Sequence, residues 1–167
     1  IFNLMMDSAN RIGAIEKLTL SSLDLDNMLF KDIREKRGYR VDVVFEKYTK
    51  ELIEEWLELR RDMDDLKTDA LFIVKHGNEY KPMTRSTIQN RVKKMGNIIG
   101  ISDFHSHCLR KSRLNSIYED TGDIALAAEL ANHKSIETTR SSYIRPKSKK
   151  ELRDKLEALK LKKQEDE

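Results

Sequence analysis

Apolar residues recur at helical spacing along most of the chain. The segment 4–20 keeps its apolar residues on one face, but the polar run from Asp7 to Asn10 interrupts it, and a second helical piece begins at Arg11. A helix that runs to about Ile99 follows Thr84, which is its expected N-cap. Further helices are predicted over 48–63, 107–119, 123–131 and 148–163.

Short apolar runs with turn residues beside them predict a few strands. Residues 28–33 and 41–45 flank a charged turn over 34–39, and residues 71–74 precede the turn signal Gly77–Asn78. We therefore expect a mainly α fold with one small antiparallel β-sheet in the N-terminal third. Pro146 blocks the chain, so residues 1–147 should form one domain and 148–167 a C-terminal helix. The leucine stripe of that helix packs either on its own domain or on a neighbouring protomer.

Length and composition describe one soluble domain. The chain has 167 residues, of which 38% are hydrophobic and 37% charged. No apolar run approaches the roughly 20 residues that span a bilayer, and Ile1 to Met6 lacks the features of a signal peptide. The chain starts within a predicted helix, so we expect a fragment of a longer protein. Cys108, the single cysteine, fits a reducing cytoplasm.

The charge is modest overall but clustered. The net charge is +3, and basic residues gather at 31–40 and 85–94. Such clusters permit binding of nucleic acid, although a charged run is more often a solvated face than a binding site.

A group of polar side chains carries the candidate chemistry. His107, Arg110, His133 and Tyr143 lie close together near the C-terminus, and Arg11 and Lys36 lie far upstream. Arginine donates two hydrogen bonds to phosphate oxygens, and histidine or lysine can donate a proton to a leaving oxygen. A tyrosine hydroxyl becomes nucleophilic when nearby cations stabilise its phenolate. These types together suit cleavage of a phosphodiester by an oxygen nucleophile.

The spacing alone leaves other interpretations open. His107 and Arg110 share one helix face, but surface pairs of this kind are common. Four histidines raise the question of a metal, yet no histidine, cysteine or carboxylate cluster has usable ligand spacing. We therefore expect neither a metal nor a cofactor.

Several motifs, in this order, resemble the catalytic domain of tyrosine recombinases, the phage-integrase family. Residues 10–18 resemble the first arginine box, and His107-Cys108-Leu109-Arg110 matches the His-x-Leu-Arg core of the second. Residues 133–139 match the histidine and paired threonines that follow, and residues 143–146 match the ending with its tyrosine. The resemblance covers most of the chain and implies the DNA breaking-rejoining fold of that family.

The resemblance also implies a function and a role for each residue. Arg11 and Arg110 would clamp the scissile phosphate with help from His107, and His133 would support the phosphate or the nucleophile. Lys36 would be the general acid, and Tyr143 would attack to form a 3′-phosphotyrosyl link. The implied activity is site-specific recombination by an integrase of a mobile element. The implied partners are double-stranded DNA and further copies of the chain in a tetrameric synapse.

The chain departs from the family pattern at three positions. Ala14 stands where a carboxylate is usual, and Asn132 replaces the glycine before the histidine, which should alter the turn. Tyr143 lies one position late, with Ser142 in the expected place, and a one-residue insertion in a loop costs little. Two alternatives therefore stay open: a catalytically impaired DNA-binding or regulatory domain of the same fold, and a DNA-relaxing topoisomerase. Lys31 is the alternative to Lys36 as the general acid.

Overall fold

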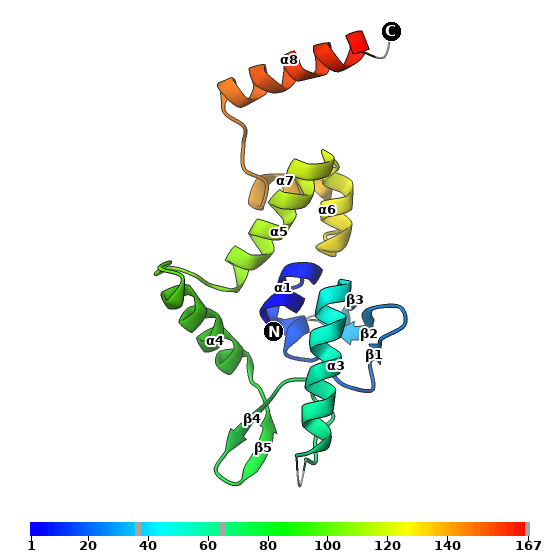
Figure 1. Cartoon of the computed structure of the whole chain (residues 1–167), viewed down its shortest axis with the longest axis vertical. Helices are drawn as coiled ribbons and strands as arrows, with labels where there is room; N and C mark the ends of the chain where they lie inside the picture. The colour runs from blue at the N-terminus through cyan, green and yellow to red at the C-terminus, as the bar shows by residue number, and fades with distance from the viewer. Residues whose placement is uncertain (36–37, 64–65, 166–167) are drawn as a thin grey trace.

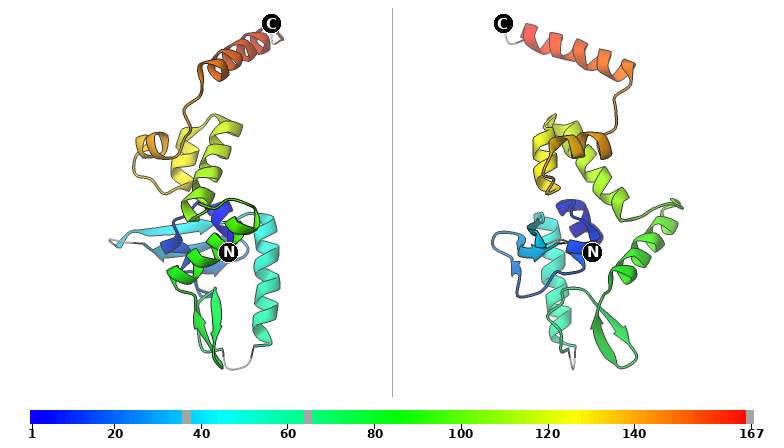
Figure 2. Two further views of the ribbon diagram at one scale, coloured as in Figure 1. Left: turned by 90° about the vertical axis from the view of Figure 1, so that its left-hand side faces the viewer. Right: turned by 180° about the vertical axis from the view of Figure 1, so that it is seen from behind.

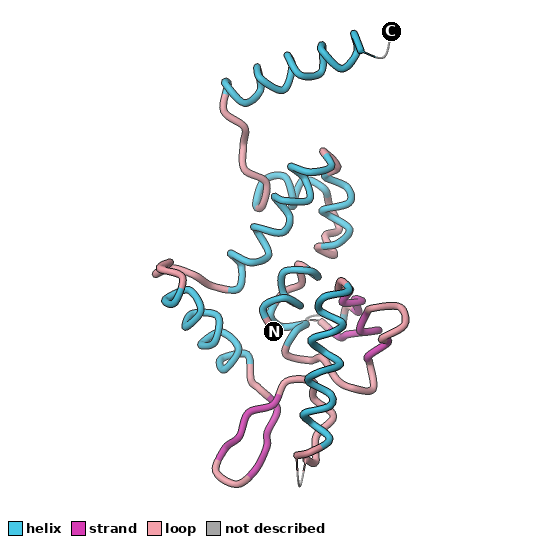
Figure 3. Tube along the Cα trace, viewed as in Figure 1, coloured by secondary structure: helices cyan, strands magenta, loops and turns pink. Residues whose placement is uncertain are grey.

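The computed structural model describes residues 1–35, 38–63 and 66–165. Helices make up most of this part of the chain, together with two small antiparallel sheets (Figures 1 and 3). The mainly α fold class is confirmed. No helix among the described residues is both long and apolar enough to cross a bilayer.

The N-terminal helix breaks where the polar run predicted. Helix α1 (Phe2–Ser8) ends as the Ser8 hydroxyl donates to the Leu4 carbonyl over 2.7 Å. Ala9 then takes a left-handed conformation with φ of 47°, and α2 (Ile12–Ile15) follows with Arg11 as its N-cap. The break turns the chain so that Arg11 begins a helix of its own.

The first sheet is a three-stranded antiparallel meander of β1 (Leu23–Asp24), β2 (Leu29–Arg34) and β3 (Arg40–Val44). In β3 alternate residues are buried, as expected for a half-buried strand. In β2 the buried residues are Phe30 and Ile33, because the register shifts between them and Asp32 has φ of 60°. This bulge changes which residues at the end of β2 face inward.

A second sheet is the hairpin of β4 (Ile73–His76) and β5 (Glu79–Pro82). The sequence predicted a strand over 71–74 and the turn at Gly77–Asn78, but not the second strand that pairs with it. The residues of β5 are mostly exposed, so no apolar alternation marks the strand. Helix α3 (Lys47–Arg61) precedes this hairpin and α4 (Arg85–Ile98) follows it. The Thr84 hydroxyl accepts a hydrogen bond from the Thr87 amide over 3.3 Å, which confirms Thr84 as the N-cap of α4.

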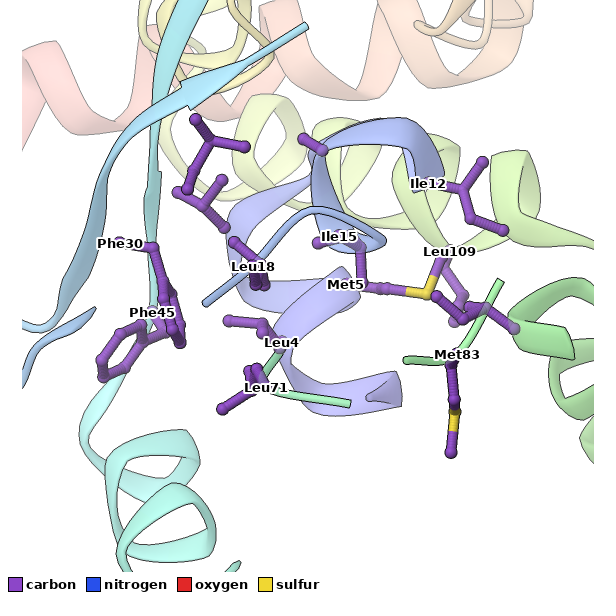
Figure 4. Close-up of a cluster of buried hydrophobic side chains, with 14 of the residues drawn as sticks. Leu4, Met5, Ile12, Ile15, Leu18, Phe30, Phe45, Leu71, Met83 and Leu109 are labelled. Carbon is purple, nitrogen blue, oxygen red and sulfur yellow. The ribbon is translucent and has the colours of Figure 1, made fainter. Parts of the chain in front are cut away.

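The main core lies between α1, α2, the first sheet, α3 and α4, and Leu109 reaches it from the next helix (Figure 4). Its largest members are fully or almost fully buried. They are Leu4, Met5, Ile15, Leu18, Phe30, Leu71 and Ile88. Since burial of each such side chain stabilises the fold by about 1.5–3 kcal/mol, this cluster fixes the position of α1 and α2.

A second layer of helices lies next to α1. Helices α5 (Ser106–Thr121), α6 (Ile124–Leu130) and α7 (Ile136–Ser142) follow one another, and α1 contacts α5. Leu114 of this layer forms a second buried cluster with Ala127, Ala131 and Ala9, the C-cap of α1. Helix α7 was not predicted, because its sequence is polar and carries no apolar stripe. Its N-cap is Ser135, whose hydroxyl accepts from the Glu137 amide.

The last helix, α8 (Lys149–Glu165), extends away from the rest of the molecule in every view (Figures 1 and 2). An extended segment that contains Pro146 joins it to α7. The leucines of its predicted stripe are exposed: Leu152 by 49%, Leu156 by 62% and Leu159 by 58%.

Candidate active site

Arg110 lies at the centre of the site, and its side chain is only 1% exposed. Its guanidinium donates to the backbone carbonyl of Ala9 from Nη1 and to that of Ala131 from Nη2, the latter over 2.8 Å. Ala9 and Ala131 are the C-caps of α1 and α6, where helix dipoles place negative charge. One cation therefore joins two helix ends and fixes where α5 lies against α1.

The turn after α6 places His133 beside this guanidinium. Asn132 takes a left-handed conformation with φ of 54°, which asparagine tolerates better than most residues. Its side-chain amide donates to the Asn10 side-chain oxygen over 3.3 Å. Asn132 thus adopts the left-handed backbone conformation that a glycine at this position would also favour.

The His133 imidazole makes one contact from each ring nitrogen. Nε2 lies 2.7 Å from Arg110 Nη2, and Nδ1 lies 2.7 Å from the Thr139 hydroxyl. Burial, and then the positive charges of Arg110 and Arg11, lower the pKa of His133 to about 4. The ring is therefore neutral near pH 7.

Tyr143 closes the same group of side chains. Its ring lies 5.0 Å from the His133 ring and 5.2 Å from the Arg110 guanidinium carbon. It is the C-cap of α7, whose Thr139 carbonyl accepts its amide over 3.0 Å. The Asn115 side chain donates to the Tyr143 carbonyl and accepts from the Arg145 amide over 2.9 Å. Ser142, in the place where the tyrosine was expected, is exposed.

Arg11 lies at the open side of the site. Its Nη1 is 3.4 Å from Glu35 Oε2, with the two side chains 41% and 14% exposed. Glu35 thus gives Arg11 a carboxylate partner, whereas Ala14 is fully buried. A hollow of about 470 Å³ extends from Arg11 and Glu35 to His133 and is also lined by Lys134.

His107 lies in the first turn of α5 and is exposed. Its pKa is lowered, first by desolvation and then by the charges of Arg110, His105, Arg11 and Arg85. Although His107 and Arg110 are on the same predicted helix face, one is open to solvent and the other is not. The structure thus brings Arg110, His133 and Tyr143 into direct contact and leaves Arg11 and His107 at the rim.

The predicted general acid, Lys36, lies outside the described residues. Its rival Lys31 forms an ion pair with Asp24, which raises the pKa of the lysine. Lys134 is a cation that the sequence interpretation did not single out. Its ammonium lies 2.7 Å from the Tyr39 hydroxyl and 4.1 Å from the centre of the ring. Its position directly after His133 was the one feature of the sequence that could have marked Lys134 as a residue of the site.

Two more residues of the site were missed. Thr139 was noted only as part of the paired-threonine motif, and nothing in the sequence marked Asn115. Among the described residues, no cluster of three or more histidine, cysteine or carboxylate side chains has a geometry that could hold a metal ion.

Comparison with known proteins agrees with this arrangement. The family model described as "Phage integrase family" matches residues 1–150. The chain belongs to the phage integrase family. A tyrosine recombinase XerC of Pseudomonas aeruginosa is 30% identical over 139 residues, which are 83% of this chain and 44% of that protein. The chain therefore spans less than half of the length of this curated relative.

Solved structures of recombinases share the fold of this family member. A crystal structure of XerA recombinase matches 91% of this chain and 54% of its own, with a TM-score of 0.74 and 24% identity. XerH recombinase bound to its difH substrate, in a pre-cleavage complex, matches 83% of this chain and 40% of its own, with a TM-score of 0.67 and 22% identity. The family and fold predicted from the motifs are both confirmed.

Proposed function

We propose that this chain is the catalytic domain of a tyrosine-type site-specific recombinase that cuts and rejoins double-stranded DNA. The observation that carries the proposal is the contact of a buried arginine with a neutral histidine and a tyrosine ring, Arg110 with His133 and Tyr143. Relatives in the family are named tyrosine recombinases, and the similar structures include a transposon integrase in complex with a circular intermediate DNA.

In the proposed reaction the Tyr143 oxygen attacks the scissile phosphorus. The phenol releases its proton to water, since the charges of Arg110 and Arg11 stabilise the phenolate. A bond forms between Tyr143 Oη and phosphorus, and the bond from phosphorus to the 5′ oxygen breaks. Lys36 gives a proton to that oxygen, and the 3′-phosphotyrosyl link conserves the energy for rejoining.

The remaining residues hold the phosphate. Arg110 and Arg11 offer hydrogen bonds and positive charge to its non-bridging oxygens, which gain charge in the transition state. His107, in the first turn of α5, assists from the open side. Integration of a mobile element and a cytoplasmic location belong to the same proposal and rest on the family resemblance.

Two contacts support an active enzyme over an impaired DNA-binding domain. Tyr143 lies against Arg110 and His133 despite its late position in the motif. Glu35 pairs with Arg11 although Ala14 lacks a carboxylate. For each of the two departures that favoured the alternative, a contact in the fold thus supplies what the sequence motif lacks.

Trapping of a covalent adduct tests the proposal. The chain, or the longer protein that contains it, is incubated with nicked suicide duplexes whose flanking arms are randomised. After cleavage the short leaving strand diffuses away and a detergent-resistant protein–DNA adduct accumulates. We expect a phosphotyrosyl peptide at Tyr143, loss of the adduct in Tyr143→Phe, and retention in the matched control Ser142→Ala.

Two results would contradict this assignment. An adduct that persists in Tyr143→Phe would mean that another residue is the nucleophile. DNA binding without an adduct from any duplex in the pool would support the DNA-binding alternative.

We further propose that α8 docks on a second copy of the chain, as part of a tetrameric synapse on DNA. Its leucine stripe is exposed in the described structure, and the helix projects from the rest of the molecule (Figure 2). Sedimentation analysis of the chain and of Leu152→Lys/Leu159→Lys tests this. A self-associating chain that the double substitution makes monomeric, with unchanged thermal stability, supports docking in trans. Loss of thermal stability in the monomer would indicate packing on its own domain.

A further inference from the structure

Thr139 is a buried polar residue to which the proposed reaction assigns no role. Its side chain is fully buried in α7, and its hydroxyl oxygen lies 2.7 Å from His133 Nδ1. Its backbone carbonyl accepts the amides of Tyr143 over 3.0 Å and of Ile144 over 3.2 Å. Thr139 therefore contacts the histidine through its side chain and the tyrosine segment through its backbone.

The contacts of His133 determine where its proton lies. A guanidinium has only donors, so the nitrogen that faces Arg110 Nη2 must accept. The Nε2 of His133 therefore carries a lone pair. The neutral ring keeps its single proton on Nδ1, which donates to the Thr139 hydroxyl.

The charged and titratable groups that face the ring agree with a neutral imidazole. Arg110 from α5 and Arg11 at the start of α2 place positive charge near it, and the Tyr143 ring packs beside it. Both cations disfavour a second proton on the ring. The protein without ligand should thus hold a single tautomer, with the proton on Nδ1.

A phosphodiester in the site reverses this requirement. Phosphate oxygens accept hydrogen bonds, so a ring nitrogen that faces one must donate. Both hydrogens of Arg110 Nη2 are used, one by the Ala131 carbonyl and one by His133, so a phosphate oxygen that binds Nη2 on the open side takes the hydrogen that now faces the ring. When phosphate takes a hydrogen of Nη2, His133 Nε2 loses its donor and faces an acceptor instead.

We propose that Thr139 is a positioning residue that lets His133 switch between its two neutral tautomers as phosphate enters the site. A hydroxyl both accepts and donates. It accepts from Nδ1–H in the empty site and donates to the bare Nδ1 when the ring proton has moved to Nε2. The ring exchanges its proton through water and gains none, so its charge is unchanged. This inference rests on the proposed function only in taking phosphate as the ligand.

The test reads the tautomer directly. The chain is prepared with ¹⁵N-labelled histidine rings, and two-bond ¹H–¹⁵N spectra are recorded at neutral pH with increasing inorganic phosphate, against sodium chloride of equal ionic strength. We expect His133 with its proton on Nδ1 in chloride and on Nε2 in phosphate. Thr139→Ser should keep the switch, and Thr139→Val should lose it. Thr49→Val, which removes a buried hydroxyl in α3, is the matched control and should keep it.

Adduct formation on the suicide duplexes gives the second readout. Loss of a partner for a buried ring nitrogen should slow it by about tenfold in Thr139→Val, with near recovery in Thr139→Ser. A ring that keeps its proton on Nδ1 at every phosphate concentration, or already carries it on Nε2 in chloride, overturns the inference. The NMR spectrum does not depend on DNA cleavage. If the proposed function is wrong, the adduct assay fails while the tautomer of His133 still responds to phosphate.

Discussion

Asn115 ties the segment that carries Tyr143 to α5, and its removal tests how firmly the proposed nucleophile is held. Its amide nitrogen donates to the Tyr143 carbonyl and to the Lys111 carbonyl, and its oxygen accepts the Arg145 amide over 2.9 Å. Asn115→Ala removes the two hydrogen bonds that reach the segment. At about 1 kcal/mol each they amount to about 2 kcal/mol, or an open population raised by about 30-fold.

Limited proteolysis measures this opening without DNA. Trypsin can cut after Lys147, just beyond the segment, and its rate follows the open population when opening and closing are fast. We expect Asn115→Ala to be cut there about 10- to 30-fold faster than the unaltered chain. Partial exposure of Asn115 sets the lower figure, because water replaces part of what is lost.

The control is Asn90→Ala, at an exposed position of α4. Both substitutions place alanine inside a helix and raise its intrinsic stability by up to about 0.7 kcal/mol. Global melting should therefore change little or rise slightly in both variants, and only Asn115→Ala should open the segment. Equal cleavage rates in the two variants would refute the idea that Asn115 holds Tyr143 in place.

Three further predictions concern the groups around Arg110. Asn132→Gly should change the free energy of unfolding in urea by less than about 0.5 kcal/mol, whereas Asn132→Val should lower it by about 1–3 kcal/mol, because a β-branched residue is strained at φ of 54°; equal losses would contradict this. Arg110→Met should lower the free energy of unfolding by about 2–4 kcal/mol, because the carbonyls of two helix C-caps lose their hydrogen-bond donor. An unchanged thermal unfolding curve would argue against that capping role. The pKa of His133 is about 4 in the folded chain and near 6.5 in the unfolded chain, and folding also lowers the pKa of His107. Between pH 4 and 6.5 the unfolded chain therefore binds more protons than the folded chain. The free energy of unfolding should fall as the pH decreases through this range. His133→Gln should flatten that decline in urea titrations, and an unaltered slope would assign the pH dependence to other groups.

The sequence predicted well those elements whose burial follows their period. Helix α3 and the N-cap of α4 are confirmed, because an apolar stripe and a capping hydroxyl act locally. Helix α7 and β5 were missed because neither buries an apolar face of its own. Their structure depends on neighbours that periodicity does not reveal.

The candidate site, too, could be predicted in part from the sequence. The motif order led to Arg110, His133 and Tyr143, which are in contact in the structure. It did not reveal that Arg110 is buried and His107 exposed, because α5 carries polar residues on both faces. The alternation of apolar and polar residues also could not reveal the bulge at Asp32, because a bulge shifts the pairing register without any marked change in residue type.

The bond from Arg110 to Ala9 also has a consequence for how the chain folds. It joins residues 101 positions apart, and the Asn132–Asn10 bond joins residues 122 positions apart. Contacts of such long sequence separation form only after the entropy of closing a long loop has been overcome, which slows the folding of topologies that depend on them. Local helices can form early, but the group around Arg110 requires both ends of the domain. A chain that is still being synthesised therefore cannot bring Arg110, His133 and Tyr143 together until residues beyond Tyr143 are available.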